Sequence, residues 1–170
     1  MRHLYLLRHA KSSWKDESLA DFDRPLAGRG RRACDVIGEF ITTNEIEFDL
    51  AVSSTAVRAR DTIDLIRQRA RLKFEVRYDE RIYEAGEARL LEVISQTEND
   101  KKSVMLVGHN PGLEQLLQSL TGTEETFPTA ALAKINLKIS KWSESLTGKA
   151  TLEWVVRPKE LEREGEREKG

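Results

Sequence analysis

Two short apolar runs, each followed by a histidine, constrain the fold of this chain more than any other feature. The first run covers residues 4–7 and leads into Arg8 and His9, and the second covers residues 103–107 and leads into His109. Unbroken apolar runs of this length are typical of strands buried on both faces of a parallel sheet. We therefore expect a sheet in which polar side chains directly follow at least two strands.

The hydrophobic periodicity between and after these runs alternates between strand and helix. Residues 28–30 are rich in glycine and are expected to form the turn before the first helix. The expected strands cover 4–7, 48–53, 74–78 and 103–107, and the expected helices carry their apolar faces within 33–41, 59–66, 90–94 and 113–120. Strands that alternate with helices predict an α/β chain with a parallel sheet.

The last third of the chain changes pattern. Residues 133–139 and 152–156 alternate apolar with polar or small side chains, which predicts edge strands that can pair antiparallel. The whole pattern predicts a three-layer α/β/α sandwich around a mainly parallel central sheet with an antiparallel edge. Residues 1–158 are expected to form a single domain, and the nearly all-charged tail, 159–170, a frayed helix or a disordered segment.

Composition narrows the classes of partner. The 170 residues include 28 Lys plus Arg and 29 Asp plus Glu, so the formal net charge is -1 and no global field favours nucleic acid or an anionic membrane. One cysteine, Cys34, cannot form an intramolecular disulfide. The apolar runs are far shorter than the roughly 20 residues that span a bilayer. We expect a cytoplasmic protein without nucleic-acid or membrane partners.

Three polar clusters follow predicted strands and are expected to converge. They are Arg8 with His9, the segment 53–58, and His109, and ligands of open α/β sheets bind beyond the carboxyl ends of the strands. Arginine forks match phosphate oxygens, and a neutral imidazole can attack phosphorus while a second one donates a hydrogen bond. Asn110 is a natural helix N-cap and Pro111 a natural first helical residue, so a partial positive charge is expected nearby.

This arrangement requires no metal ion. A third histidine, His3, lies six residues before His9 in the same predicted strand, which separates the two by roughly 20 Å. Zinc ligands must all lie within about 2 Å of one ion. His3 is therefore expected to be structural or exposed, and no cofactor is expected.

Four motifs resemble those of the histidine phosphatase superfamily, also called the phosphoglycerate mutase-like family. They are LLRHAKSSW, DRPLAGRGRRA over 23–33, SSTAVRARDT over 53–62 and VGHNPGL over 107–113, in the order and spacing of that family. Ala10 stands where glycine is usual in the first motif. The small size, RHAKSSW and GHNPGL resemble the SixA-type phosphohistidine phosphatases.

The resemblance implies a role for each matching residue. His9 is the nucleophile that is transiently phosphorylated, and the group is bound by Arg8, Arg58 and His109, with Ser12 assisting. The proton donor is Glu80, which matches the family glutamate, or Glu84, four residues later; Glu80 is slightly favoured.

Three functions remain open from the sequence. The leading one is hydrolysis of phosphohistidine on a partner protein, and the second is hydrolysis of a small phosphorylated metabolite such as a sugar phosphate. The third is a non-catalytic module that binds phosphate. Trp14 lies in the loop after His9, where it either walls the pocket or only packs the loop.

Overall fold

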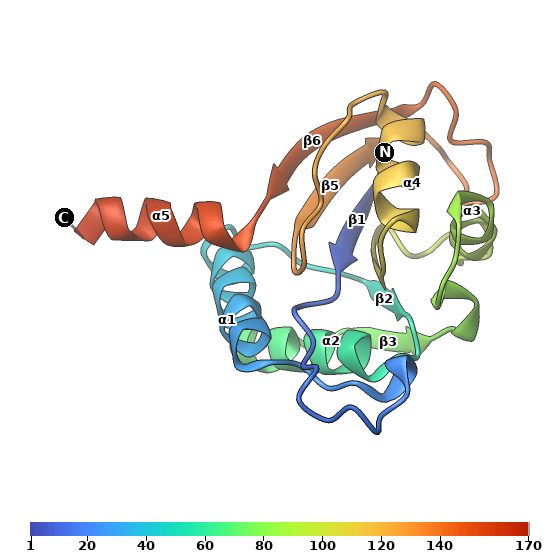
Figure 1. Ribbon diagram of the computed structural model, residues 1–170. Coiled ribbons are helices and arrows are strands. Elements are labelled where there is room, and N and C mark those ends of the chain that lie inside the picture. The colour runs from blue at the N-terminus through green and yellow to red at the C-terminus, as the bar shows by residue number, and fades with distance from the viewer. Residues whose placement is uncertain (170) are drawn as a thin grey trace.

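The computed structural model describes residues 1–169 as a six-stranded sheet with helices on both faces (Figure 1). The strands are β1 (Arg2–Arg8), β2 (Leu50–Ser53), β3 (Glu75–Tyr78), β4 (Ser103–Gly108), β5 (Leu132–Leu137) and β6 (Ala150–Val156). The helices are α1 (Gly28–Thr43), α2 (Val57–Ala70), α3 (Glu87–Ser95), α4 (Gly112–Thr121) and α5 (Pro158–Lys169), with short 3-10 turns η1 (Asp21–Asp23) and η2 (Glu80–Ile82). Strands and helices alternate along the chain as far as α4.

The strand order is β3-β2-β4-β1-β5-β6. The first four strands in sequence pair in parallel, and β5 and β6 pair antiparallel at the β1 side. The predicted α/β/α sandwich with a mainly parallel sheet and an antiparallel edge is confirmed. The carboxyl ends of β1, β4 and β2 consequently lie side by side.

The prediction that residues 133–139 form an edge strand is wrong, because β5 lies between β1 and β6. Its polar residues pair with the flanking strands. Lys134 Nζ lies 2.7 Å from a carboxylate oxygen of Glu153, and Asn136 Oδ1 lies 2.7 Å from His3 Nδ1. The alternating pattern therefore reflects polar pairs across the strands of the sheet and not a solvated edge.

Two apolar cores lie on opposite faces of the sheet. Leu4 and Leu6 belong to the core that includes α3 and α4, whereas Tyr5 and Leu7 belong to the core that includes α1 and α2. Successive side chains of a strand point to opposite faces. The run at 4–7 is apolar throughout because both faces of β1 are covered.

The two helices that follow the histidines begin differently from the sequence prediction. Gly28 and Gly30 lie inside the first turn of α1 instead of forming a turn before it. A Cβ atom on Gly30 would lie 2.2 Å from the carbonyl oxygen of Lys11, so close backbone approach is what requires glycine there. In α4 the capping residue is Pro111, one residue later than expected, and Asn110 Oδ1 still accepts a hydrogen bond from Glu114 N at 3.3 Å.

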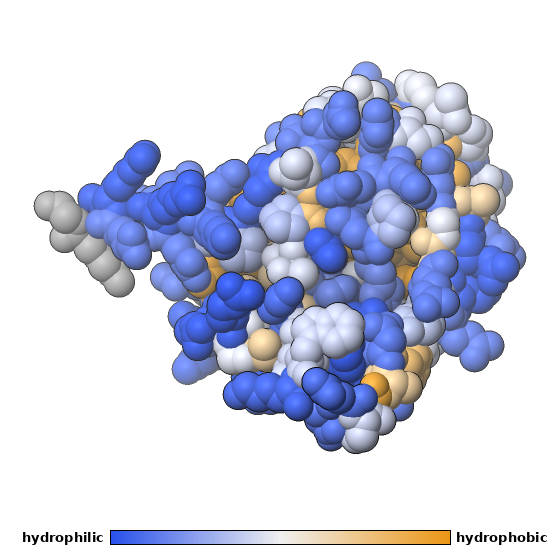
Figure 2. Space-filling model, viewed as in Figure 1, coloured by the Kyte–Doolittle hydropathy of each residue, from blue (hydrophilic) through white to orange (hydrophobic). Residues whose placement is uncertain are grey.

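Residues 158–169 form α5, which projects from the body of the molecule (Figure 1). Figure 2 shows this helix covered almost entirely by hydrophilic side chains. Leu161, which is partly buried, packs against the core on the α1 side of the sheet. Within residues 1–169, no helix has the length and apolar character to cross a membrane.

Candidate active site

The predicted convergence of the three polar clusters is observed at the carboxyl edge of the sheet. His9 follows β1, His109 follows β4 and Ser54 follows β2. Backbone hydrogen bonds from His9 N to Gly108 O (3.1 Å) and from Ser54 N to Val107 O (2.9 Å) continue the strand pairing into these segments. The rings of His9 and His109 consequently face each other with centroids 5.0 Å apart.

The hydrogen bonds of His9 define its tautomer. Nδ1 lies 2.8 Å from the carbonyl oxygen of Ala10, and because a carbonyl only accepts, Nδ1 must carry the proton. Nε2 then has the lone pair, in agreement with the Nε–H of Arg58 that points at it from 3.4 Å. That contact is long and weak, so the lone pair of Nε2 remains available for nucleophilic attack.

Both histidines are kept neutral. Burial lowers the pKa of His9 to about 3; the hydrogen bond to the Ala10 carbonyl opposes this effect, and the positive charges of Arg58 and Arg8 add to the lowering. Burial and the same two arginines lower the pKa of His109 to about 4. An imidazole must be neutral to attack phosphorus, so this environment favours the reactive form of His9.

Two arginines supply the positive charge. Arg8 is the last residue of β1; its guanidinium donates to the carbonyl oxygen of Phe127 at 3.2 Å, and its Nε has no hydrogen-bond partner among the described residues. Arg58 lies in the first turn of α2 and is buried. Thr62 links the two segments, since its Oγ1 donates to Arg58 O at 2.6 Å and accepts from Ala10 N at 2.9 Å.

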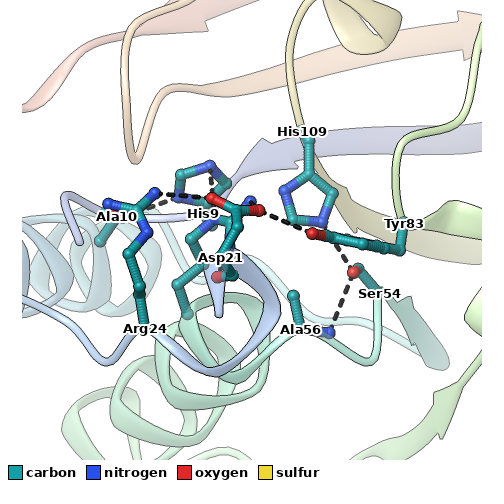
Figure 3. A network of polar contacts seen from close by, with 9 residues as sticks. His9, Ala10, Asp21, Arg24, Ser54, Ala56, Tyr83 and His109 are labelled. Carbon is teal, nitrogen blue, oxygen red and sulfur yellow. Dashed lines mark hydrogen bonds and ion pairs between the residues drawn. The ribbon is translucent and has the colours of Figure 1, made fainter. Parts of the chain in front are cut away.

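Asp21, from the loop after β1, bridges several donors at the site (Figure 3). One carboxylate oxygen accepts from Arg58 at 3.1 Å and from the Tyr83 hydroxyl at 2.6 Å, and the other accepts from Arg24 at 3.0 Å. The hydrogen bond from Tyr83, with the charge of Arg58, lowers the pKa of Asp21 to about 2. The site therefore contains an anion, the Asp21 carboxylate, between the guanidinium groups of Arg58 and Arg24.

His109 has an unused hydrogen-bonding atom. Its Nε2 lies 2.7 Å from Ser54 Oγ, whereas its buried Nδ1 finds no partner within residues 1–169. Buried polar atoms without partners are uncommon in native proteins. His109 can therefore form one further hydrogen bond with a ligand beside His9.

The other predicted site residues lie differently. Glu80 and Glu84 are both exposed, and in the described part of the chain neither forms a hydrogen bond or ion pair with His9, His109 or Arg58. Tyr83, between them, is the side chain of this segment that reaches the site. Ser12 is buried beside Leu26, with no hydrogen bond from its hydroxyl to His9 within residues 1–169.

Sequence reasoning missed Asp21, Arg24 and Tyr83. Asp21 and Arg24 are three residues apart in the loop that follows the first histidine motif, a spacing that lets them pair. Tyr83 offered no signal beyond its position between two acidic candidates. Across residues 1–169, His, Cys, Asp and Glu side chains form no group of three that could hold a metal ion.

Comparison with known proteins gives consistent matches. The model of the family described as "Histidine phosphatase superfamily (branch 1)" matches residues 4–87. The chain is 33% identical over 157 residues to an uncharacterised protein from Mycobacterium tuberculosis, a match that covers 86% of this chain and 96% of that protein.

Two solved structures are similar over nearly the whole chain. One, from Agrobacterium tumefaciens, is 31% identical with a TM-score of 0.79, covering 92% of this chain and 98% of that chain. The other, from Nakamurella multipartitia, is 25% identical with a TM-score of 0.82, covering 92% and 96% respectively. Both are described as putative phosphohistidine phosphatases SixA.

Proposed function

The chain belongs to the histidine phosphatase superfamily, and from this premise we propose that it hydrolyses phosphohistidine on proteins. One observation carries the proposal. His9 is a neutral imidazole whose Nδ1 is tied to the Ala10 carbonyl, which leaves Nε2 unprotonated beside Arg58 and opposite His109. Such a group can attack phosphorus without a metal ion.

The proposed reaction has two steps. Nε2 of His9 forms a bond to phosphorus while the P–N bond of the substrate breaks, and the substrate ring, already protonated on its other nitrogen, departs as a neutral imidazole. Water then attacks phospho-His9, and both of its protons leave with the phosphate. In each step Arg8, Arg58 and His109 stabilise the phosphoryl oxygens.

The substrate class follows from the leaving group. An alkyl phosphate needs an acid to protonate the departing oxygen, and the two candidate carboxylates, Glu80 and Glu84, are exposed and lie outside the hydrogen-bond network of the site. A protonated phosphoimidazole needs no such acid. The likeness to structures described as phosphohistidine phosphatases supports the same choice.

The partner in this proposal is a phosphohistidine-bearing protein. Cytoplasmic location belongs to the same proposal and is supported by Cys34, a buried free thiol of the kind that reducing compartments preserve. Burial raises the pKa of this thiol to about 12, so it is a packed side chain and not a second nucleophile.

The test compares turnover of a phosphohistidine-bearing protein and of an aryl phosphate, both with EDTA present. We expect the protein substrate to react faster, EDTA to have no effect, and His9→Asn to lose about a thousandfold or more on both substrates. The matched control is His3→Asn, because His3 lies at the other end of β1 and pairs with Asn136.

Three outcomes would contradict the proposal. Activity retained by His9→Asn would exclude this nucleophile. Turnover of sugar phosphates but not of the phosphoprotein would favour the small-molecule phosphatase. Binding of phosphate by an inert wild type would favour the non-catalytic module.

A further inference from the structure

Arg24 is a buried cation with unused hydrogen-bond donors at the edge of the site. Its exposed fraction is 7%, and Nε and one terminal nitrogen, Nη1, lie buried without a hydrogen-bond partner among residues 1–169. The other terminal nitrogen donates to Asp21. Buried arginine donors are normally all satisfied, so the free ones indicate a missing acceptor.

The loop that carries Arg24 is fixed to the segment just after His9. Ser13 N donates to Pro25 O and Ala27 N donates to Lys11 O, both at 2.8 Å, and Ser12 and Leu26 form a β-bridge between these two bonds. Arg24 is therefore held at the site by backbone pairing and does not rely on the ion pair with Asp21.

Trp14 supports the guanidinium of Arg24 from one face. The ring centroid lies 3.3 Å from the central carbon of the guanidinium, although Trp14 itself is 67% exposed. Stacking uses the face of a guanidinium and leaves the N–H groups along its edge free to donate. The contact thus orients the fork without consuming its donors, which explains why an exposed tryptophan lies in this loop.

Asp21 joins Arg24 to the rest of the site. One carboxylate oxygen lies 3.0 Å from Arg24, a contact seen in Figure 3. The other lies 3.1 Å from Arg58, so one anion bridges two guanidinium groups. Arginine forks accept carboxylate and phosphate oxygens with the same geometry. The Asp21 side chain is 47% exposed and can turn into solvent, whereas both arginines are buried.

We propose that Arg24 is a third phosphate-binding arginine and that Asp21 occupies the place of phosphoryl oxygens until the substrate displaces it. The inference rests on the proposed function and adds a binding residue to that site. When the phosphoryl group enters, two of its oxygens replace the carboxylate oxygens on Arg24 and Arg58. A bidentate phosphoryl contact uses the Arg24 nitrogen that Asp21 now occupies together with a neighbouring free donor, which then gains the acceptor that it lacks.

The test measures binding of inorganic phosphate to the chain of 170 residues by calorimetry, independently of turnover. Arg24→Lys keeps the charge but loses the fork, and we expect phosphate to bind about tenfold more weakly. The matched control is Arg2→Lys. Arg2 is also buried, has an unpaired Nε among the described residues, and lies over a tryptophan, Trp142, but at the start of β1. Its substitution should change phosphate affinity by less than about twofold.

A second variant tests displacement with the opposite sign. Asp21→Asn removes the competing anion, so phosphate should bind roughly threefold to tenfold more tightly. Asp23→Asn removes the same charge from the same turn, where Asp23 is exposed, and should change affinity by less than about twofold.

The outcomes separate this inference from the proposed function. The inference would be overturned if Arg24→Lys bound phosphate as tightly as the wild type, or if Asp21→Asn bound it more weakly. Neither result would contradict the proposed phosphatase function. An equal gain in phosphate affinity in Asp21→Asn and Asp23→Asn would show that Asp21 acts only through its charge. That result would contradict the displacement of Asp21 by phosphate. Failure of the wild type to bind phosphate would remove both the proposed function and the role of Arg24.

Discussion

The two site histidines resist protonation because of where their rings lie. Both pKa values are lowered, to about 3 for His9 and about 4 for His109, first by burial and then by nearby cations. In the unfolded chain an imidazole titrates near 6.5, so the unfolded state takes up protons first as the pH falls. The contribution of these neutral rings to the free energy of unfolding is complete above about pH 6.5. It is lost as the pH falls toward the folded pKa values.

At the residue scale we predict that His9 and His109 give neutral-imidazole signals in an NMR titration down to about pH 5. Over the same range the free energy of unfolding should fall by up to roughly 2 kcal/mol for each ring. His109→Gln should remove the part of this decrease in the free energy of unfolding that comes from His109. A titration midpoint between about pH 6 and 7 for His9 would contradict the prediction.

At the element scale, the helices that follow the histidines each have, in their first turn, a glycine in close contact with a carbonyl group. A Cβ atom would lie 2.2 Å from Lys11 O at Gly30 and 2.2 Å from Ala85 O at Gly112. Each contact brings a helix start against a loop that borders the site. Glycine therefore costs some helix propensity here but permits the close approach of each helix to its loop.

We predict that Gly30→Ala lowers the free energy of unfolding by roughly 1 to 3 kcal/mol and reduces turnover, because Lys11 and the loop behind His9 must move. Gly28→Ala is the control in the same helical turn, where the new Cβ atom would meet only Arg32 Nη1 at 3.5 Å. That change should leave stability unchanged or raise it by up to about 1 kcal/mol. Chemical denaturation of both variants checks the difference, and equal effects would contradict the close-contact explanation.

At the scale of the whole molecule, the strand order brings the site together. β4 lies between β1 and β2, so three strands that are distant in the sequence end at adjacent positions. α5 lies apart from this edge, contacting α1 and projecting from the body (Figure 1). The hydrophilic surface of α5 in Figure 2 fits a segment that contributes little to the core.

We predict that residues 1–158 fold and remain active without 159–170. Deleting the tail should lower the free energy of unfolding by roughly 1 to 2 kcal/mol, mainly through loss of Leu161, which packs on the α1-side core. Leu161→Ala in the full chain should reproduce most of that loss. Turnover should stay within about twofold of wild type; inactivity of the folded truncated protein would show that the tail belongs to the functional domain.

The sequence by itself determined the layered fold and the position of four site residues along it. Hydrophobic periodicity is local, and a strand buried on both faces reads as an apolar run whatever its neighbours are. His9, Arg8, Arg58 and His109 could be assigned to strand or helix ends for that reason, and parallel pairing then implied that they meet.

Only the tertiary structure decided the rest. The alternating pattern of β5 is expected both for an edge strand and for an interior strand with polar pairs. The position of β5 between β1 and β6 is therefore known only from the observed strand pairing. Asp21, Arg24 and Tyr83 reach the site from irregular segments whose course depends on long-range hydrogen bonds and not on periodicity. Glu80 matches the family glutamate by position in the sequence and Glu84 lies four residues later, but the local backbone exposes both and directs Tyr83 inward instead.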